Sequence, residues 1–283
     1  MKRKWIRWVS WILLTPIILF VILMVLLYVP PVQNLLRREV TAYASKVTGM
    51  QIQVERIDLR FPLNLLVRGV EVIQQPDTLL SLESLNVRVQ AWPLIKGKVE
   101  VDEVTLSRVA VNSADLMEGM KIKGVLGRFF LQSHGVDLSN ELAVINQVEL
   151  SDTHMQLLMN DTTTTPKDTT ASAPINWKVA LHQLKLKNVS FGMQLPADSM
   201  RMTAHIGEAA INNAQADLKN QYYDLKKFLL SGTSASYDTG TAQPTEGFDA
   251  SHIAVRDIRI ALDSLLYKGR DMNAVIREFT MNE

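Results

Sequence analysis

Cysteine is absent from this chain of 283 residues. Its absence excludes disulfides, thiolate metal sites and a cysteine nucleophile. A long basic run or stripe is missing as well, because 30 Lys and Arg residues balance 29 Asp and Glu residues and are spread along the sequence. Nucleic-acid binding needs a concentration of positive charge, so no nucleic-acid partner is expected.

Motifs of catalysis and cofactor binding are also missing. Residues 124–127 lack the Lys-Ser/Thr ending of a phosphate loop, and no Gly-x-Ser-x-Gly elbow is present. The adjacent carboxylates Asp102 and Glu103 have no predicted pocket that would shift their pKa for acid–base work. The sequence therefore predicts a protein that is not an enzyme and holds no metal or cofactor. Five histidines are far apart and form no metal motif: His134, His154, His182, His205 and His252.

One long hydrophobic run is evident near the N-terminus. Residues 9–29 follow a basic tip that contains Lys2, Arg3, Lys4 and Arg7. As a helix, 21 residues at about 1.5 Å each span about 31 Å, the thickness of a bilayer's hydrocarbon core. No small-residue cleavage site follows, so the run predicts an uncleaved transmembrane anchor. The leading charges place the N-terminus in the cytoplasm and the rest of the chain across the membrane, in a bacterium the periplasm.

A short amphipathic helix is predicted over residues 32–49, ending at Gly49. It could lie on the membrane surface or cover the end of the sheet that follows. The second arrangement is favoured, because an open sheet end needs cover. The apolar residues at helical spacing are Leu35, Leu36, Val40, Tyr43 and Val47.

From residue 50 onward, apolar residues recur at spacings of two and then three. Between Val99 and Val111 they fall at positions 99, 101, 104, 106, 109 and 111. A helix would scatter these positions around its axis, whereas a strand places residues two apart on one face. The intervening residues are mostly polar. The pattern predicts an antiparallel sheet with one apolar and one solvated face.

Each step of three has two explanations. A β-bulge would add one residue, bend the strand and keep the apolar residues on one concave face. Alternatively, each step marks the end of a strand or a tight turn. The apolar face is large in either case, and it must either close on itself as a dry sandwich or form a trough occupied by acyl chains. The predicted membrane anchor favours the trough, because one open end would lie beside a source of lipid.

Composition divides the chain into five regions. Asp217–Leu230 fits a helix or a strand, and the recurring pattern favours the strand. Ser231–Gly247 is predicted to be a loop, and the chain ends at Glu283 within a patterned run. A closing unit is therefore expected from a partner or from a longer protein. The regions are the basic tip with its anchor (1–31), the helix that caps the groove (32–49), a first β-groove region (50–159), a Thr-rich linker or loop (160–174) and a second β-groove region (175–283).

The order of these features resembles the N-terminal part of the TamB family of the AsmA-like superfamily, most of all the forms in Bacteroidota. Three stretches carry the resemblance, the turn in the last of them most specifically. The resemblance implies an elongated, curved β-groove with β-taco-like repeats, preceded by one transmembrane helix. It also implies phospholipid transfer toward the outer membrane and an outer-membrane barrel partner, although the region that contacts that barrel is missing here. The stretches are Thr48–Gly49, Ile52–Pro62 and Thr78–Asn112, with the turn at Trp92–Lys98.

The expected function is passive conduction of phospholipid between the inner and outer membranes, with acyl chains in the trough and head groups at its rim. An alternative is a membrane-anchored scaffold that assists outer-membrane protein assembly by strand addition, and a third is a β-solenoid spacer. Pattern alone does not separate these functions. The residues predicted to line the groove are Ile52, Val54, Ile57, Leu59, Leu80, Leu82, Leu85, Val87, Val99, Val101, Val104, Leu106, Leu184, Leu186, Ile258 and Ile260.

Overall fold

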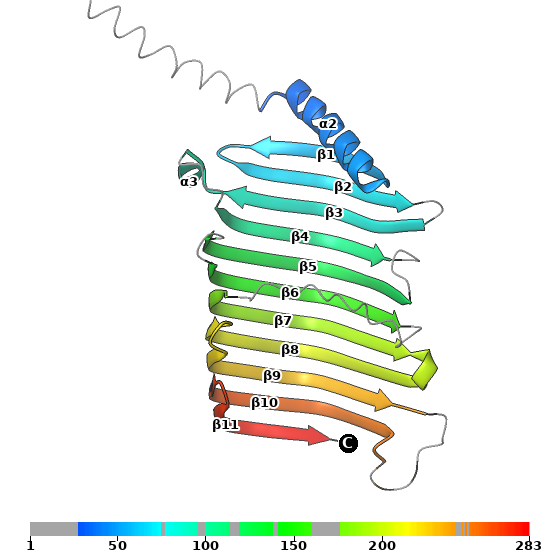
Figure 1. The fold of residues 1–283 in the computed structure, drawn as a ribbon, viewed down its shortest axis with the longest axis vertical. Coiled ribbons are helices and arrows are strands. Elements are labelled where there is room, and N and C mark those ends of the chain that lie inside the picture. The colour runs from blue at the N-terminus through cyan, green and yellow to red at the C-terminus, as the bar shows by residue number, and fades with distance from the viewer. Residues whose placement is uncertain are drawn as a thin grey trace, which may run out of the picture.

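The computed structural model contains one long, curved sheet of 11 strands in which the spatial order follows the sequence from β1 to β11 (Figure 1). It describes residues 28–74, 77–95, 100–113, 119–137, 141–159, 176–240, 245, 247 and 249–282. The elements are α2 (Pro30–Thr48), β1 (Gln51–Arg60), β2 (Asn64–Gln74), β3 (Asp77–Val89), α3 (Ala91–Ile95), β4 (Val101–Asn112), β5 (Met120–Asp137), β6 (Leu142–Met159), β7 (Lys178–Leu195), the 3₁₀ helix η1 (Pro196–Asp198), β8 (Met200–Asp217), β9 (Tyr222–Asp238), β10 (His252–Lys268) and β11 (Asp271–Asn282).

One pair of strands departs from the predicted antiparallel arrangement. Strands β6 and β7 are parallel, with Leu142 opposite Lys178 and Leu158 opposite Gln194. Parallel neighbours need a crossover connection of a dozen or more residues, whereas antiparallel neighbours can be joined by a tight turn. The predicted Thr-rich linker, 160–174, falls in this connection and lies outside the described residues. The prediction of a wholly antiparallel sheet was wrong here, because a long connection permits either direction.

The strands bend along a common line, here called the crease, where the spacing between apolar residues changes from two to three. In six strands the crease residue has a positive φ, between 48° and 59°. A β-bulge would change the pairing between two strands at the crease. From β1 to β9, the pairing register of neighbouring strands is the same on both sides of the crease, so most of the steps of three are not the predicted β-bulges. Nor are they strand ends. Register shifts do occur at the crease between β9, β10 and β11. The six residues are Gly69, Arg108, Asp152, Asn188, Gly232 and Asp257.

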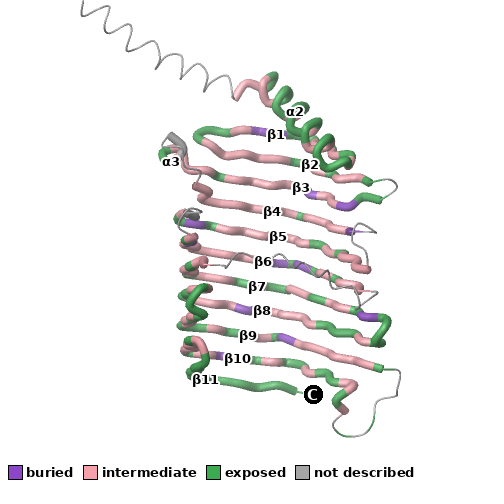
Figure 2. The backbone as a smooth tube through the Cα atoms, in the orientation of Figure 1, coloured by how far each residue is buried: buried purple, intermediate pink, exposed green. Residues whose placement is uncertain are grey.

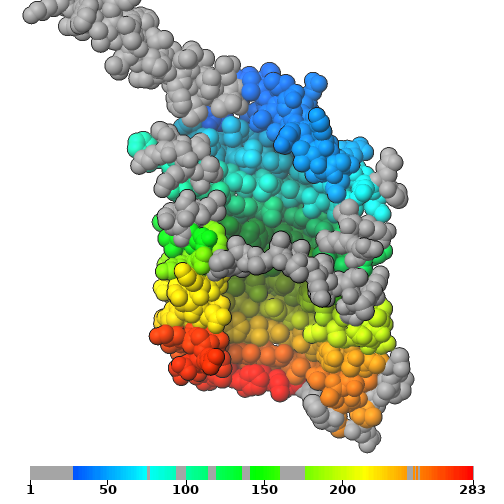
Figure 3. Space-filling view, viewed as in Figure 1, coloured from blue at the N-terminus to red at the C-terminus, as the bar shows by residue number. Residues whose placement is uncertain are grey.

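The crease explains the spacing of three and the direction of the bend. In β7, Leu186 and Val189 lie on one face, and the two exposed residues between them, Lys187 and Asn188, both face the other side. Two consecutive side chains on one side of a strand occupy the outside of a bend, so the strand bends toward its apolar face. A second crease passes through His182, six residues before Asn188. The space-filling view shows the sheet hollowed between its two long sides (Figure 3).

The hollow is open. No large side chain in the described residues is fully buried, and the few buried positions are scattered over the sheet (Figure 2). Pairing links β1 only to β2 and β11 only to β10, so the sheet does not close into a barrel. A dry sandwich would require a second layer over the apolar face. Within the described part of the chain, the apolar face is therefore a groove and not a closed core.

The predicted short helix is present as α2, and Gly49 ends it in the left-handed conformation at φ 70°. No helix among the described residues is long and apolar enough to cross a membrane. The predicted anchor at residues 9–29 lies outside the described residues except for its last two positions. Its presence therefore stays a prediction.

One predicted loop begins later than expected, because its first part belongs to a strand. Strand β9 continues to Asp238, so the prediction of a loop from Ser231 was wrong over its first eight residues. Gly232 occupies the crease, and the small residues around it pair with β8, including Ser231 with Glu208. Gly and Ser suggest loops on composition, but they also suit a bend within a strand.

Candidate functional site

Two apolar rows form the base of the groove. Each row runs across all eleven strands through directly opposite residues, and every member is aliphatic or phenylalanine. Eleven strands at about 4.8 Å spacing make these base rows about 48 Å long. The first base row is Leu59, Leu65, Val87, Val104, Leu131, Val148, Leu184, Ile211, Phe228, Leu262 and Ile276, and the second is Ile57, Val67, Leu85, Leu106, Phe129, Leu150, Leu186, Ala209, Leu230, Ile260 and Phe279.

Two further rows extend the apolar lining beyond the first crease. One runs from Val54 in β1 to Ile206 in β8 and contains a single polar member, Thr153. The other begins at Ile52 and reaches Val255 in β10. These side rows form one wall of the groove. Phe191 in the second side row is 44% exposed, so this wall is open to a ligand.

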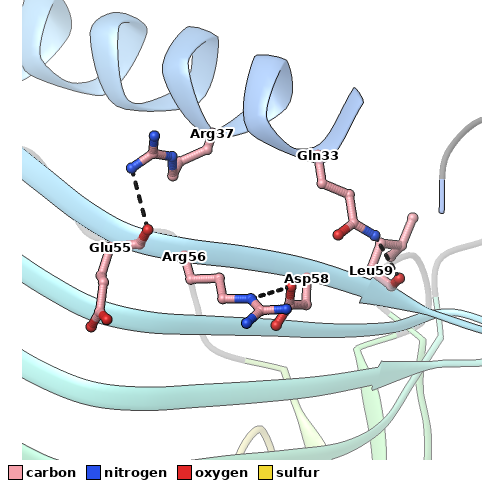
Figure 4. Close-up of polar contacts among 6 residues, drawn as sticks. All are labelled: Gln33, Arg37, Glu55, Arg56, Asp58 and Leu59. Carbon is pink, nitrogen blue, oxygen red and sulfur yellow. Dashed lines mark hydrogen bonds and ion pairs between the residues drawn. The ribbon is translucent and has the colours of Figure 1, made fainter. Parts of the chain in front are cut away.

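On the opposite face of the sheet, two polar rows run alongside the pair of base rows, one on each side. The row from Arg56 to Ser231 and the row from Arg60 to Lys227 contain only charged or hydrogen-bonding side chains. Arg56 is 64% exposed and pairs at 2.6 Å with Asp58 of its own strand (Figure 4). The outer row between these two is mixed and includes Leu66, Phe130 and Leu229. The sheet therefore presents apolar residues to the groove and mainly polar residues to the outside.

The structure places most predicted lining residues in these rows, and that they contact lipid stays a prediction. Val101 lies beyond the second crease and pairs with Val89, while Ile258 pairs with Thr233. Val99 lies outside the described residues. The base rows contain Ile57, Leu59, Leu85, Val87, Val104, Leu106, Leu184, Leu186 and Ile260, and the side rows contain Ile52, Val54, Leu80 and Leu82.

Sequence reasoning missed part of the lining. Strands β2, β5, β6, β8, β9 and β11 contribute to both base rows, yet the residues named above as the predicted lining include none from these strands. The alternation of Phe129 and Leu131 could have identified β5, but Gly124 and Gly127 weakened that pattern. Gly124 is itself covered by the Met155 side chain, whose Sδ occupies the space that a Cβ would need.

Helix α2 covers the free edge of β1 with polar side chains (Figure 4). Gln33 Nε2 donates to the carbonyl of Leu59 at 2.9 Å, and Arg37 donates to the carbonyls of Val54 and Glu55 at 3.1 and 3.2 Å. The backbone N–H of Ile52 in turn donates to Ser45 Oγ at 3.1 Å. These bonds satisfy backbone groups that an edge strand would otherwise leave unpaired.

Two turns carry shifted carboxyl groups. A hydrogen bond from the Asn220 side chain, and another from its backbone, lower the pKa of Asp217. The backbone N–H of Ser251, the His252 side chain and the backbone N–H of Thr245 lower the pKa of Asp249 to about 2. Both shifts arise from local turn hydrogen bonds that favour the ionised form.

Chemistry beyond apolar contact is sparse in the described part of the chain. No three His, Asp or Glu side chains there are grouped so that they could hold a metal ion. Comparison with models of known protein families finds no match. Comparison with curated proteins finds no match either. The geometry of the groove is therefore the basis for a function.

Proposed function

We propose that this protein is an envelope lipid conduit, anchored in the inner membrane, that carries phospholipid acyl chains along its groove between the inner and outer membranes. The observation that carries the proposal is the pair of base rows, which are apolar across every strand and open to the outside. Monomeric soluble proteins rarely leave so large an apolar surface uncovered. A lipid tail is a ligand of matching shape and chemistry.

The base rows suit sliding of a lipid chain. Burial of each methylene contributes about 0.8 kcal/mol. Because neither base row is interrupted by a polar residue, this contribution stays nearly constant as an acyl chain moves from strand to strand. Barriers to sliding are then low. Head groups remain at the polar rim, and the direction of transfer is set by the membranes or by partners.

The anchor and the partner also belong to this proposal. The predicted membrane segment at residues 9–29 would hold the α2 end of the sheet beside the inner membrane. The β11 end then points toward the outer membrane. An outer-membrane barrel protein is the proposed partner, as the resemblance to the TamB family implies, through a region outside these residues.

Lipid occupancy tests the proposal. We would purify the full chain in mild detergent and measure bound phospholipid by mass spectrometry. Leu184→Lys places a charge in the first base row and should remove the lipid while circular dichroism still shows a β fold. Val101→Asp places a charge beyond the second crease, opposite Val89, and should also reduce the bound lipid. Ala210→Lys is the matched control, because it adds the same charge beside Lys185 on the outer face.

Two results would contradict the conduit. The first is a folded wild-type protein without lipid. The second is a Leu184→Lys variant that retains normal lipid while folded. Either result would favour the second candidate, a scaffold that binds client strands at its free edge.

A further inference from the structure

Helix α2 has two flanks that differ in chemistry: one is an apolar stripe, and the other carries Arg38 and Ala42 together with the exposed Leu35. Its outer flank faces a pocket of about 740 Å³, lined from the helix by residues including Arg38 and Ala42. From the sheet, the same pocket is lined by residues 52–55 of the edge strand β1 and, in β2, by Gly69 and Glu71. Glu71 lies opposite Gln53 on the polar face, so the pocket extends over that face from the edge of β1. The side of the helix that carries Arg38 and Ala42 is therefore turned toward the polar face of the sheet.

The other flank of α2 is apolar. Leu36, Val40, Tyr43 and Val47 follow the spacing of one helical stripe and are 41%, 46%, 72% and 65% exposed. At 100° per residue, Val40 lies about 160° around the helix from Ala42. Since Ala42 is on the side of the polar face, the apolar stripe is on the side of the groove.

This arrangement reverses that of an ordinary surface helix. Such helices bury an apolar stripe against the protein and expose a polar side. Helix α2 instead contacts β1 through Gln33, Arg37 and Ser45, and it leaves its apolar stripe exposed. The first side row ends at Val54 and the second at Ile52, both in β1. The apolar stripe therefore continues the lining of the groove past the last strand.

We propose that the apolar stripe of α2 is the entry ramp by which phospholipid acyl chains pass between the membrane and the groove. This inference rests on the proposed function. The predicted membrane segment ends at residue 29 and α2 begins at Pro30, so such an anchor would hold the start of the ramp at the membrane surface. An acyl chain that moves along Leu36, Val40, Tyr43 and Val47 reaches the side rows at β1 in continuous contact with apolar side chains.

Kinetics of lipid uptake test the ramp. The full chain is reconstituted in phosphatidylethanolamine and phosphatidylglycerol vesicles, and transfer of a fluorescent phospholipid into the protein is followed with time. Val40→Asp should slow the transfer about tenfold, because it places a charge on the path of the chain. Ala42→Asp carries the same charge change on the outer flank of the same helix and should leave the rate within about twofold. Lipid bound after equilibration in detergent should be unchanged in both variants.

The outcomes separate this inference from the function on which it rests. A wild-type protein without lipid overturns the conduit itself. A lipid-loaded protein in which Val40→Asp and Ala42→Asp transfer lipid at equal rates overturns the ramp alone. If Val40→Asp does not fold, a photoreactive residue at Tyr43 and another at Ala42 provide a second measurement. Crosslinks to lipid at position 43 and not at 42 support the ramp, and equal crosslinks at both overturn it.

Discussion

Asn188 and Asp152 face each other across the parallel strands β7 and β6, and the Asn188 amide Nδ2 donates a 2.7 Å hydrogen bond to Asp152 Oδ1. Both residues have left-handed backbone conformations, with φ values of 53° and 51°. Asn and Asp adopt this conformation more readily than other non-glycine residues. At the first crease, two residues that readily adopt the left-handed conformation are therefore joined by a side-chain hydrogen bond, which links the two strands at the bend.

Asn188→Val should lower the free energy of unfolding by about 1 to 2 kcal/mol, because a β-branched side chain is strained at positive φ and cannot form the bond to Asp152. Urea denaturation followed by circular dichroism measures the loss. Lys187→Val is the control, since Lys187 is the exposed neighbour on the same strand and has no positive φ. An equal loss in both variants would show that the crease conformation does not matter for stability.

Gly127→Ala should be destabilising by about 1 to 3 kcal/mol, because overpacking forces neighbouring atoms apart. A Cβ at Gly127 would stand 2.7 Å from Asp152 Cβ and 2.8 Å from the Asp152 carbonyl oxygen. Gly192→Ala is the matched control, because its Cβ would meet nothing closer than 3.8 Å. Thermal unfolding of the two variants tests the difference, and similar midpoints would contradict it.

Arg37→Ala should detach α2 from β1. The change removes the hydrogen bonds to the carbonyls of Val54 and Glu55, and bonds from a charged donor contribute about 1.5 to 3 kcal/mol each. Faster amide hydrogen exchange across α2 and β1 is the expected result. Arg38→Ala should leave exchange unchanged, since Arg38 lines the outer pocket and makes no such bond to β1 in the described structure. If amide hydrogen exchange were unchanged in Arg37→Ala, contacts other than these hydrogen bonds would hold α2 on β1.

The Asp249 turn should loosen in acid. The pKa of Asp249 is lowered from 3.8 to about 2 by its bonds to Ser251, His252 and Thr245, so the folded state favours the ionised carboxylate. The stabilisation is complete above pH 4 and is lost as the pH falls toward 2. NMR titration of the Ser251 amide should show a midpoint near 2. Asp249→Asn should abolish that titration, and a midpoint near 3.8 would contradict the shift.

The alternation of apolar and polar residues was sufficient to predict strands over most of the chain and, in strands such as β7, the side that faces the groove. Leu184 and Leu186 lie in the base rows because residues two apart share a face whatever the partner strand is. The same local rule favoured a strand over a helix for Asp217–Leu230, and β9 confirms the strand from Tyr222 onward, after a turn at residues 218–221. The predicted end of the short helix at Gly49 is confirmed as well, since Gly is the residue that best adopts the left-handed cap.

The pairing between strands could not be predicted from this local pattern. A step of three, such as Leu186 to Val189, has the same appearance whether one strand bulges or all strands bend together. The register across neighbours distinguishes the two, and it is a property of the assembled sheet. The parallel pairing of β6 and β7 escaped prediction for the same reason.

The sequence by itself determined that this chain forms amphipathic strands with a continuous apolar face, because side-chain alternation is a local property of an extended backbone. Only the tertiary structure decided that this face stays open as a creased groove and that α2 turns its apolar stripe toward the groove side. Both features depend on which distant residues meet. Hydrogen bonds such as that from Arg37 to the carbonyl of Val54 orient the helix, and the hydrophobic pattern of the sequence does not reveal them.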